Sequence, residues 1–197
     1  LYVFHDTAEE EGAARAKVCH VIEGFEQAFP GVDCAGAAVF SGPGRTEIGG
    51  NHTDHQHGCV LCGSVNMDIL ACAVPTGDHF VKVVSEGYPA LTIDLNDLAI
   101  HADETNTSAA LIRGVAHGVT KEGFAPKGFC AYVTSTVPGG SGLSSSAAYE
   151  ILLGNIFNRF CCEGKLDAVK LAQIGQYAER EYFGKPCGLM DQAASSL

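Results

Sequence analysis

Residues Val137–Ala148 read VPGGSGLSSSAA and lie between two segments of opposite character. Residues 128–137 are rich in β-branched and aromatic side chains, which predicts a strand, and residues 149–153 begin a helical pattern. Glycines let a backbone approach an anion and adopt positive φ, while the free N–H groups at a helix start point toward it. Serine hydroxyls can bind phosphate oxygens or Mg²⁺. A strand, a glycine-rich loop and a helix in this order predict a phosphate-binding loop.

Two common nucleotide-binding motifs do not fit this loop. A Walker A loop requires Gly-Lys followed by Ser or Thr, and the chain has no such sequence. A dinucleotide fingerprint requires a third glycine, which residues 140–145 lack. A serine-capped helix after a tight turn is the simplest alternative, but it explains only the two ends of the stretch.

Composition limits the classes of protein that fit. The 197 residues are 46% hydrophobic and 18% charged, which is typical of a globular chain with a buried core. No linker or internal repeat divides residues 1–197, so we expect one domain. The formal net charge of −11 argues against nucleic acid or an anionic membrane as a partner, while still permitting a local phosphate site. The chain has no apolar run of about 18 residues, so we expect no transmembrane helix.

The nine cysteines form no regular framework, and an odd number cannot all pair within the chain. Most lie in apolar runs, where a thiol behaves as a small buried hydrophobe. The pair Cys59 and Cys62 has no second half, so zinc is not expected. We therefore expect a reducing environment and a cytoplasmic location.

The remaining segments mix helices and strands. Helical spacing of apolar residues predicts helices over residues 6–29, 107–119, 144–162 and 166–183. Apolar and β-branched runs predict strands over residues 36–41, 59–74, 80–85, 90–95 and 128–137, the first ending at Gly42-Pro43-Gly44. Because helices and strands do not strictly alternate, the pattern favours an α+β domain with a mixed sheet.

A second polar stretch, Gly42–Gly58, reads GPGRTEIGGNHTDHQHG and has the composition of a binding loop. Three interpretations compete. In the first, the stretch holds a metal cluster formed by His52, Asp54, His55 and His57. In the second, its asparagine, histidine and aspartate side chains bind the hydroxyl groups of a polyhydroxy ligand. In the third, it is a solvated turn.

A third stretch, Gly184–Gln192, reads GKPCGLMDQ and delivers one carboxylate, Asp191, to the start of a predicted helix. An aspartate at this place is often a simple N-cap. It fits equally well a catalytic carboxylate that accepts a hydrogen bond from a substrate hydroxyl.

Taken together, the three stretches resemble the GHMP kinase superfamily, and within it the galactokinases. The family's sugar signature, Gly-Arg followed by Gly-Glu-His-Thr-Asp-Tyr, is similar to Gly44–Arg45 and Gly50–His55. Its phosphate loop, Pro-x-x-x-Gly-Leu-Ser-Ser-Ser-Ala, matches Pro138–Ala147 at every fixed position, and its Cys-Gly-[Ile/Leu]-Met-Asp-Gln motif matches Cys187–Gln192. The resemblance implies the GHMP kinase N-terminal fold, which is like domain 2 of ribosomal protein S5.

The resemblance also implies roles for the motif residues, with ATP and Mg²⁺ as cofactors. Mg²⁺ would be held by Ser146 and by Glu179, which lies twelve residues before Asp191 in an Ala-Glu pair. Asp191 would face the anomeric hydroxyl of the sugar, with Arg45 against both Asp191 and the transferring phosphoryl group. The ATP phosphates would lie on Gly140, Ser141, Gly142, Leu143, Ser144, Ser145 and Ser146. The sugar would be bound by Asn51, His52, Thr53, Asp54 and Gly188.

The implied activity is ATP-dependent phosphorylation of galactose to galactose 1-phosphate. Three positions depart from the family pattern: Asn51 replaces the usual Glu, His55 a Tyr, and Glu47 an Asn. The change at Asn51 can shift preference near the C6 hydroxyl, so kinases for galactosamine, galacturonate or arabinose are alternatives. A non-catalytic sugar sensor and a metal-dependent hydrolase are the rival classes.

Members of this family are longer and have a C-terminal domain that closes the other side of the cleft. We therefore expect residues 1–197 to be the N-terminal domain of a longer enzyme, with the C-terminal GHMP domain absent from this chain. Its partners would then be a small sugar, ATP and that C-terminal domain. Because half of the pocket wall would be absent, we expect little or no turnover from this piece alone.

Overall fold

The structure is a computed structural model and describes residues 8–197. Its centre is a five-stranded sheet with the strand order β1-β2-β5-β3-β4. The strands are β1 (Ala38–Gly49), β2 (Leu61–Pro75), β3 (Phe80–Ser85), β4 (Leu91–Asp94) and β5 (Phe129–Ser135). The pair β3/β5 is parallel and the other neighbours are antiparallel. The expected mixed sheet is confirmed.

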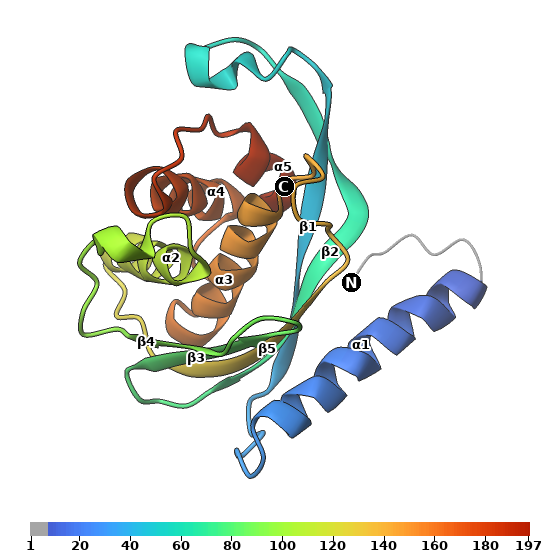
Figure 1. Ribbon diagram of the computed structural model, residues 1–197, viewed down its shortest axis with the longest axis vertical. Helices are drawn as coiled ribbons and strands as arrows, with labels where there is room; N and C mark the ends of the chain where they lie inside the picture. The colour runs from blue at the N-terminus through green and yellow to red at the C-terminus, as the bar shows by residue number, and fades with distance from the viewer. Residues whose placement is uncertain (1–7) are drawn as a thin grey trace.

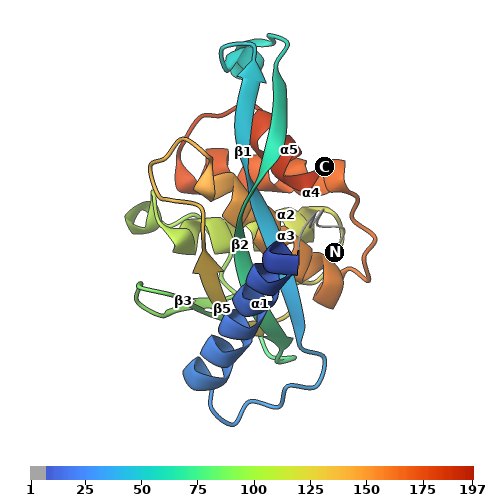
Figure 2. The ribbon, with the colours of Figure 1, turned by 90° about the vertical axis from the view of Figure 1, so that its right-hand side faces the viewer.

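Helices cover the two faces of the sheet unequally. They are α1 (Ala8–Ala28), α2 (Ser108–Lys121), α3 (Ser145–Cys161), α4 (Ala168–Tyr177) and α5 (Met190–Ser196). Helices α2 to α5 gather on one face (Figure 1), and α1 is the one described helix that crosses the other face, toward the viewer in Figure 2. Asp6, the expected start of the first helix, lies outside the described residues. The expected α+β domain is therefore a sheet with a thick helical layer on one side.

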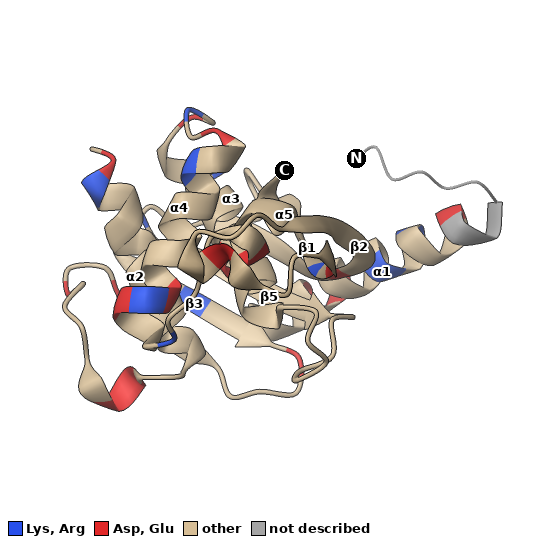
Figure 3. Cartoon of the chain, turned by 90° about the horizontal axis from the view of Figure 1, so that it is seen from above, with Lys and Arg blue, Asp and Glu red and all other residues tan. Residues whose placement is uncertain are grey.

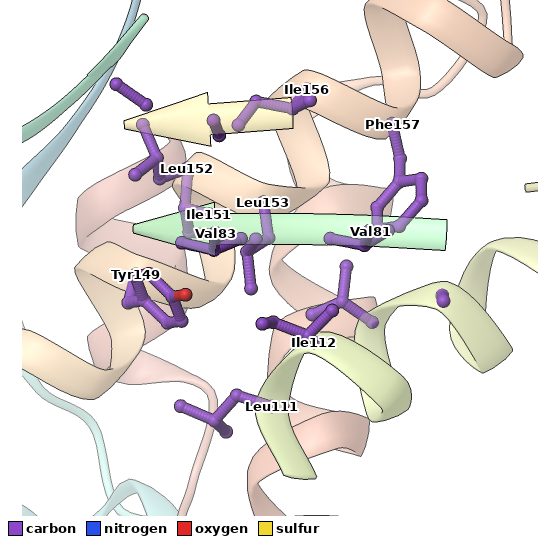
Figure 4. Close-up of a cluster of buried hydrophobic side chains, with 14 of the residues drawn as sticks. Val81, Val83, Leu111, Ile112, Tyr149, Ile151, Leu152, Leu153, Ile156 and Phe157 are labelled. Atoms are coloured by element: carbon purple, nitrogen blue, oxygen red, sulfur yellow. The ribbon is translucent and has the colours of Figure 1, made fainter. Parts of the chain in front are cut away.

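Alternating side chains along β2 supply a core to each face. On the helical face, Val81 and Val83 of β3 pack with Ile112 of α2 and with Leu152 and Phe157 of α3 (Figure 4). On the other face, a smaller cluster joins α1 to β2 and β5; it consists of Val21, Phe25, Leu70, Cys72, Val74 and Cys130. The larger core fixes the start of α3, and with it the end of the loop that precedes it.

The prediction that the first strand ends at Gly42-Pro43-Gly44 is wrong, because β1 continues through these residues to Gly49. Pro43 is tolerated because β1 is an edge strand, and the pairing with β2 shifts register just after it. A Cβ atom at Gly42 would lie 2.2 Å from the Ala148 carbonyl oxygen, so glycine is needed for β1 to approach α3 this closely. The backbone N–H of Arg45 then donates to Leu143 O at 3.0 Å. The strand thus carries Arg45 to the predicted phosphate loop.

The helix predicted over residues 166–183 is also modified. Helix α4 ends at Tyr177, and the chain continues as a π-helical segment, η3 (Ala178–Phe183), which ends at Gly184 with φ of 84°. Such wider turns are frequent at functional sites. This one contains Glu179, which has 0% exposure.

Acidic and basic residues are interspersed over several elements of the described chain, α1 and α2 among them (Figure 3). All nine cysteines have free thiols. Among the described helices, none combines the length and the apolar character that crossing a bilayer requires.

Candidate active site

A cavity of about 860 Å³ opens between the loop before α3, the turn joining β1 to β2, and the segment before α5. Its wall contains eleven of the residues that the motifs predicted: Arg45, Asn51, His52, Gly140, Ser141, Gly142, Ser144, Ser145, Ser146, Gly188 and Asp191. The other four predicted residues, Thr53, Asp54, Leu143 and Glu179, do not line it. Tertiary folding therefore brings the three polar stretches to one place.

A bidentate ion pair lies at the centre of this wall. Arg45 Nε donates to Asp191 Oδ1 and Arg45 Nη2 donates to Asp191 Oδ2, each at 2.7 Å. The two residues are only 7% and 4% exposed. Burial raises the pKa of Asp191, but hydrogen bonds from Arg45 and Ser144 outweigh it, and the pKa falls below its ordinary value. Asp191 is therefore a carboxylate at neutral pH, and its side chain does not act as the N-cap of α5.

The loop before α3 has the backbone shape that its glycines predict. Gly140 and Gly142 have φ of 73° and 77°. Ser144 has φ of 56°, which is uncommon for a residue with a side chain, and its hydroxyl does not cap α3. That hydroxyl instead donates to Asp191 Oδ2 at 2.6 Å. The left-handed residue thus connects the loop to the buried ion pair.

The turn between β1 and β2 approaches the same ion pair from the other side. Asn51 and His52 both have φ of 54°. The His52 backbone N–H donates to Glu47 Oε1 at 2.8 Å, and its ring Nδ1 lies 3.0 Å from Asp54 Oδ1. Its ring Nε2 lies 3.4 Å from Arg45 Nη2. The imidazole therefore joins the turn to the Arg45 guanidinium.

Two residues predicted to bind the sugar hold this turn in place. Asp54 Oδ2 accepts the Met190 backbone N–H at 2.9 Å, which docks the turn onto the start of α5. A Cβ at Gly188 would lie 1.8 Å from that same oxygen, so no side chain fits at position 188. The Thr53 hydroxyl donates to Gly50 O at 2.8 Å. In this structure their contacts fix the turn that presents Asn51 and His52.

The metal-cluster interpretation receives limited support. Ligand atoms of His52, Asp54 and His55 lie within 4.8 Å of one another, but His57 is not part of the group. Both Asp54 oxygens already accept a hydrogen bond, Oδ1 from the His52 ring and Oδ2 from the Met190 backbone N–H. The neighbouring Arg45 guanidinium also opposes a second cation beside His52. The arrangement is that of a braced turn.

A second carboxylate lies behind the cavity wall. Glu179 Oε1 accepts the Ser146 hydroxyl at 2.7 Å and the Lys185 ammonium at 2.9 Å. The Lys185 side chain is 50% exposed, whereas that of Glu179 is 0% exposed. A carboxylate and a hydroxyl are hard oxygen donors of the kind that Mg²⁺ prefers, and two protein ligands leave positions for water and phosphate oxygens. The donor set fits the predicted ion.

A second cavity, of about 450 Å³, was not predicted from the sequence. It shares Ser145, Ser146 and Phe183 with the first cavity, so it continues from the start of α3. Much of its remaining wall is apolar and includes Ile69, Tyr88, Pro89, Leu91, Val133 and Tyr149. No motif marks these residues, because they come from separate segments that only tertiary folding brings together, in part through the pairing of β5 with β2 and β3. Arg180 of the first cavity likewise carried no motif signal.

Comparison with known proteins agrees with the motifs. The family profile described as GHMP kinases N terminal domain matches residues 109–197, and the galactokinase galactose-binding signature matches residues 23–75. Curated galactokinases from Clostridium tetani and Levilactobacillus brevis are 32% identical over 158 residues and 34% identical over 169 residues. The chain belongs to the galactokinase family of GHMP kinases. These matches cover 80% and 84% of the chain, but only 40% and 43% of the two relatives.

Solved structures extend this result to the fold. A crystal structure of Lactococcus lactis galactokinase complexed with galactose has a TM-score of 0.82 and 28% identity, and the match covers 90% of this chain and 45% of that one. Methanococcus jannaschii mevalonate kinase has a TM-score of 0.69 at 17% identity, a likeness of fold alone, and the match covers 85% of this chain and 52% of that one. The expected GHMP kinase fold is confirmed, and this galactokinase-family chain spans less than half the length of the curated galactokinases that it matches.

Proposed function

We propose that this chain forms the sugar- and phosphate-binding N-terminal domain of a longer galactokinase, which transfers the γ-phosphoryl group of ATP to the anomeric hydroxyl of galactose. One observation carries the proposal: the Arg45–Asp191 pair lies between the phosphate loop and the sugar-signature turn. Ser144 contacts the pair from the loop and His52 contacts it from the turn. A hydroxyl bound at Asp191 would therefore lie beside a phosphate bound at the loop.

The geometry supports a division of roles between Asp191 and Arg45. Phosphoryl transfer depends on positioning and on neutralising charge more than on covalent chemistry by the protein. Asp191, ionised at neutral pH, accepts a hydrogen bond from the anomeric hydroxyl and directs a lone pair of that oxygen at the γ-phosphorus. The new O–P bond forms as the bond to the β-phosphate oxygen breaks, ADP leaves, and the hydroxyl proton passes to Asp191 or solvent. The Arg45 guanidinium stabilises the charge on the transferring group.

The remaining cavity residues suit ATP. Backbone N–H groups and hydroxyls of the loop bind its phosphates, and Arg180 and Lys185 add positive charge to the wall. Ser146 and Glu179 hold Mg²⁺, which neutralises phosphate charge when bound. The second cavity, apolar and contiguous with Ser145 and Ser146, accommodates the nucleoside.

The test is an ADP-release assay on the full-length gene product with Mg-ATP. The sugar panel contains galactose, glucose, galactosamine, galacturonate and arabinose. We expect activity on galactose, because the matched relatives are galactokinases. We expect Asp191→Ala to abolish this activity. Activity confined to another sugar would overturn galactose as the proposed substrate, and Asn51→Glu would then be the variant to test for a change in sugar preference. If the protein binds galactose but phosphorylates none of the sugars, the proposed kinase activity is wrong and the non-catalytic sugar sensor becomes the favoured hypothesis.

The same assay on residues 1–197 alone tests the domain assignment. We expect turnover from this piece to be undetectable, because the chain spans less than half the length of the matched galactokinases and the remaining part would complete the cavity. A measurable rate that depends on Asp191 would contradict this assignment.

A further inference from the structure

Beneath Ser146 lies a buried polar cluster in which the proposed function gives a role to Glu179 but none to its two partners. It joins Glu150 of α3, Gln192 of α5 and Glu179 of η3, whose residues are 1%, 0% and 0% exposed. Gln192 Nε2 donates to Glu150 Oε2 at 2.9 Å and to Glu179 Oε2 at 2.7 Å. The side-chain amide of Gln192 therefore bridges the two carboxyl groups.

Filling the core at this place with polar side chains is unfavourable for the free energy of folding. A buried polar group costs free energy unless it is hydrogen-bonded, and replacement by apolar side chains is often neutral or stabilising. Here Glu150 Oε1 and Gln192 Oε1 have no hydrogen-bonding partner among the described residues. Burial and the nearby Glu179 charge raise the pKa of Glu150 well above its ordinary value. Packing alone would be served better by leucine or methionine at positions 150 and 192.

The geometry shows what the bridge holds. Gln192 fixes Glu179 Oε2 on the interior side, which leaves Oε1 to face Ser146 and Lys185 at the cavity. Helix α4 packs closely against the bridge at Gly175. A Cβ at this position would lie 3.1 Å from Gln192 Cγ and 3.2 Å from Glu150 Oε2. Three helical elements thus set the direction of one carboxylate.

We propose that Glu150 and Gln192 are positioning residues that orient the Glu179 carboxylate, so that its Oε1 is presented beside the Ser146 hydroxyl to a divalent cation arriving with the nucleotide. The inference rests on the proposed function, since it takes Glu179 and Ser146 as the ligands. Glu150 acts through Gln192 and touches neither substrate nor ion. Partners behind a metal ligand typically change metal affinity about 10- to 100-fold when they are removed.

The test measures binding of Mn²⁺·ADP to the full-length protein by electron paramagnetic resonance, with metal-free ADP titrated in parallel. Glu150→Met and Gln192→Met remove the bridge, and we expect each to weaken Mn²⁺ binding about 10-fold with little change in metal-free ADP affinity. Glu150→Gln keeps an acceptor oxygen for Gln192 and should stay within about 2-fold of wild type, an allowance for the usual non-additivity of neighbouring groups. Ser195→Ala is the matched control, because it removes another buried unpartnered oxygen from α5 outside the bridge.

The outcomes separate the two proposals. Wild-type protein that does not bind Mn²⁺·ADP overturns the proposed function and this inference together. Wild-type binding with unchanged Mn²⁺ affinity in both methionine variants overturns only the inference, as does equal weakening of ADP affinity with and without the metal. If the methionine variants do not fold, Gly175→Ala provides the answer. We expect this variant to retain its thermal stability but to bind Mn²⁺ about 3-fold or more weakly, because the added methyl group displaces the side chains of the bridge. An unchanged Mn²⁺ affinity would contradict the proposal.

Discussion

Two buried carboxylates, Asp191 in the cavity wall and Glu179 behind it, are held in opposite ways. Asp191 is paired through both oxygens with Arg45, which is itself only 7% exposed. Glu179 is more deeply buried, yet its cationic partner, Lys185, has a side chain that is 50% exposed, and its other partners, Ser146 and Gln192, are neutral. Asp191 belongs to a closed pair, whereas Glu179 has a partner that can move into water.

Under the proposed function, this difference suits the two acids to separate tasks. A bidentate pair with a buried arginine fixes both charge and direction, which suits a group that must orient a hydroxyl. A carboxylate held by neutral donors keeps its charge available to an incoming cation, and the lysine can yield its place without being stranded in the interior. Four substitutions would break or sharpen this contrast.

The largest effect is expected from Asp191→Asn in the full-length protein. Loss of the carboxylate should lower kcat by about 10³-fold, within the range for a lost proton-handling group. It also leaves the Arg45 charge buried without its counter-ion, which should reduce the free energy of unfolding by about 3 kcal/mol. Steady-state kinetics and urea unfolding measure the two effects. The exposed Asp103→Asn is the control, and equal stability of the two variants would show that the pair is not closed.

Glu179→Gln should separate metal binding from stability. We expect the Mg²⁺ concentration for half-maximal activity to rise about 10-fold, because an amide is a poorer ligand for a hard cation. The free energy of unfolding should change by less than about 1 kcal/mol, since the half-exposed Lys185 ammonium can be hydrated and the amide removes a charge whose burial is unfavourable. The measurements are Mg²⁺ titration of activity and urea unfolding, with Lys185→Met as the companion variant. A stability loss as large as that of Asp191→Asn would remove the contrast between the two carboxylates.

Gly188→Ala tests the contact between the sugar-signature turn and α5. The added Cβ would lie 1.8 Å from Asp54 Oδ2, so the turn must move away from Met190. We expect the KM for the sugar to rise about 10-fold while the KM for ATP changes little, because a displacement of about 1 Å disturbs hydroxyl positioning at one end of the cavity. Gly12→Ala serves as the control, since no atom lies within 4 Å of the Cβ that it adds in α1. A parallel rise in both KM values would assign the effect to global disorder.

Ser144→Ala should have a smaller effect on stability than Asp191→Asn, and it fixes the sign of the pH dependence. Removing this donor should raise the pKa of Asp191 toward its ordinary value and cost about 1.5 kcal/mol. Because the folded-state pKa of Asp191 lies below the reference value of 3.8, the stability from its pairing is present above that pH and is lost as pH falls through the folded pKa. The variant should therefore lose stability at a higher pH than wild type. Acid unfolding followed by circular dichroism measures this shift, and coincident curves would contradict it.

Residues near one another in sequence account for most of what could be predicted. The helices and strands follow from apolar spacing, and the phosphate loop follows from glycines and serines between a strand and a helix. Prediction from the local sequence failed at Gly42-Pro43-Gly44, where glycine and proline normally indicate a turn. There the reason for glycine is the approach of Ala148, which is more than a hundred residues away in the chain.

The serines before α3 and the acid before α5 show the same limit. Helix capping, by a serine before α3 and by Asp191 before α5, is the simpler alternative in the sequence, because capping is the usual local use of these side chains. In the structure the two side chains hydrogen-bond to each other and do not cap their own helices. A long-range partner with charge offers more than a local backbone N–H, and no local pattern records it.

The sequence by itself determined the class of this protein: an α+β domain of the galactokinase family with three polar stretches in a fixed order. Only the tertiary structure decided how the carboxylates differ, where the second cavity lies, and that Gln192 connects Glu150 to Glu179. The physical reason is that motifs report which groups a site requires, whereas pKa, orientation and metal preference depend on burial and on neighbours. In this chain those neighbours come from distant segments, which the order of residues alone does not bring together.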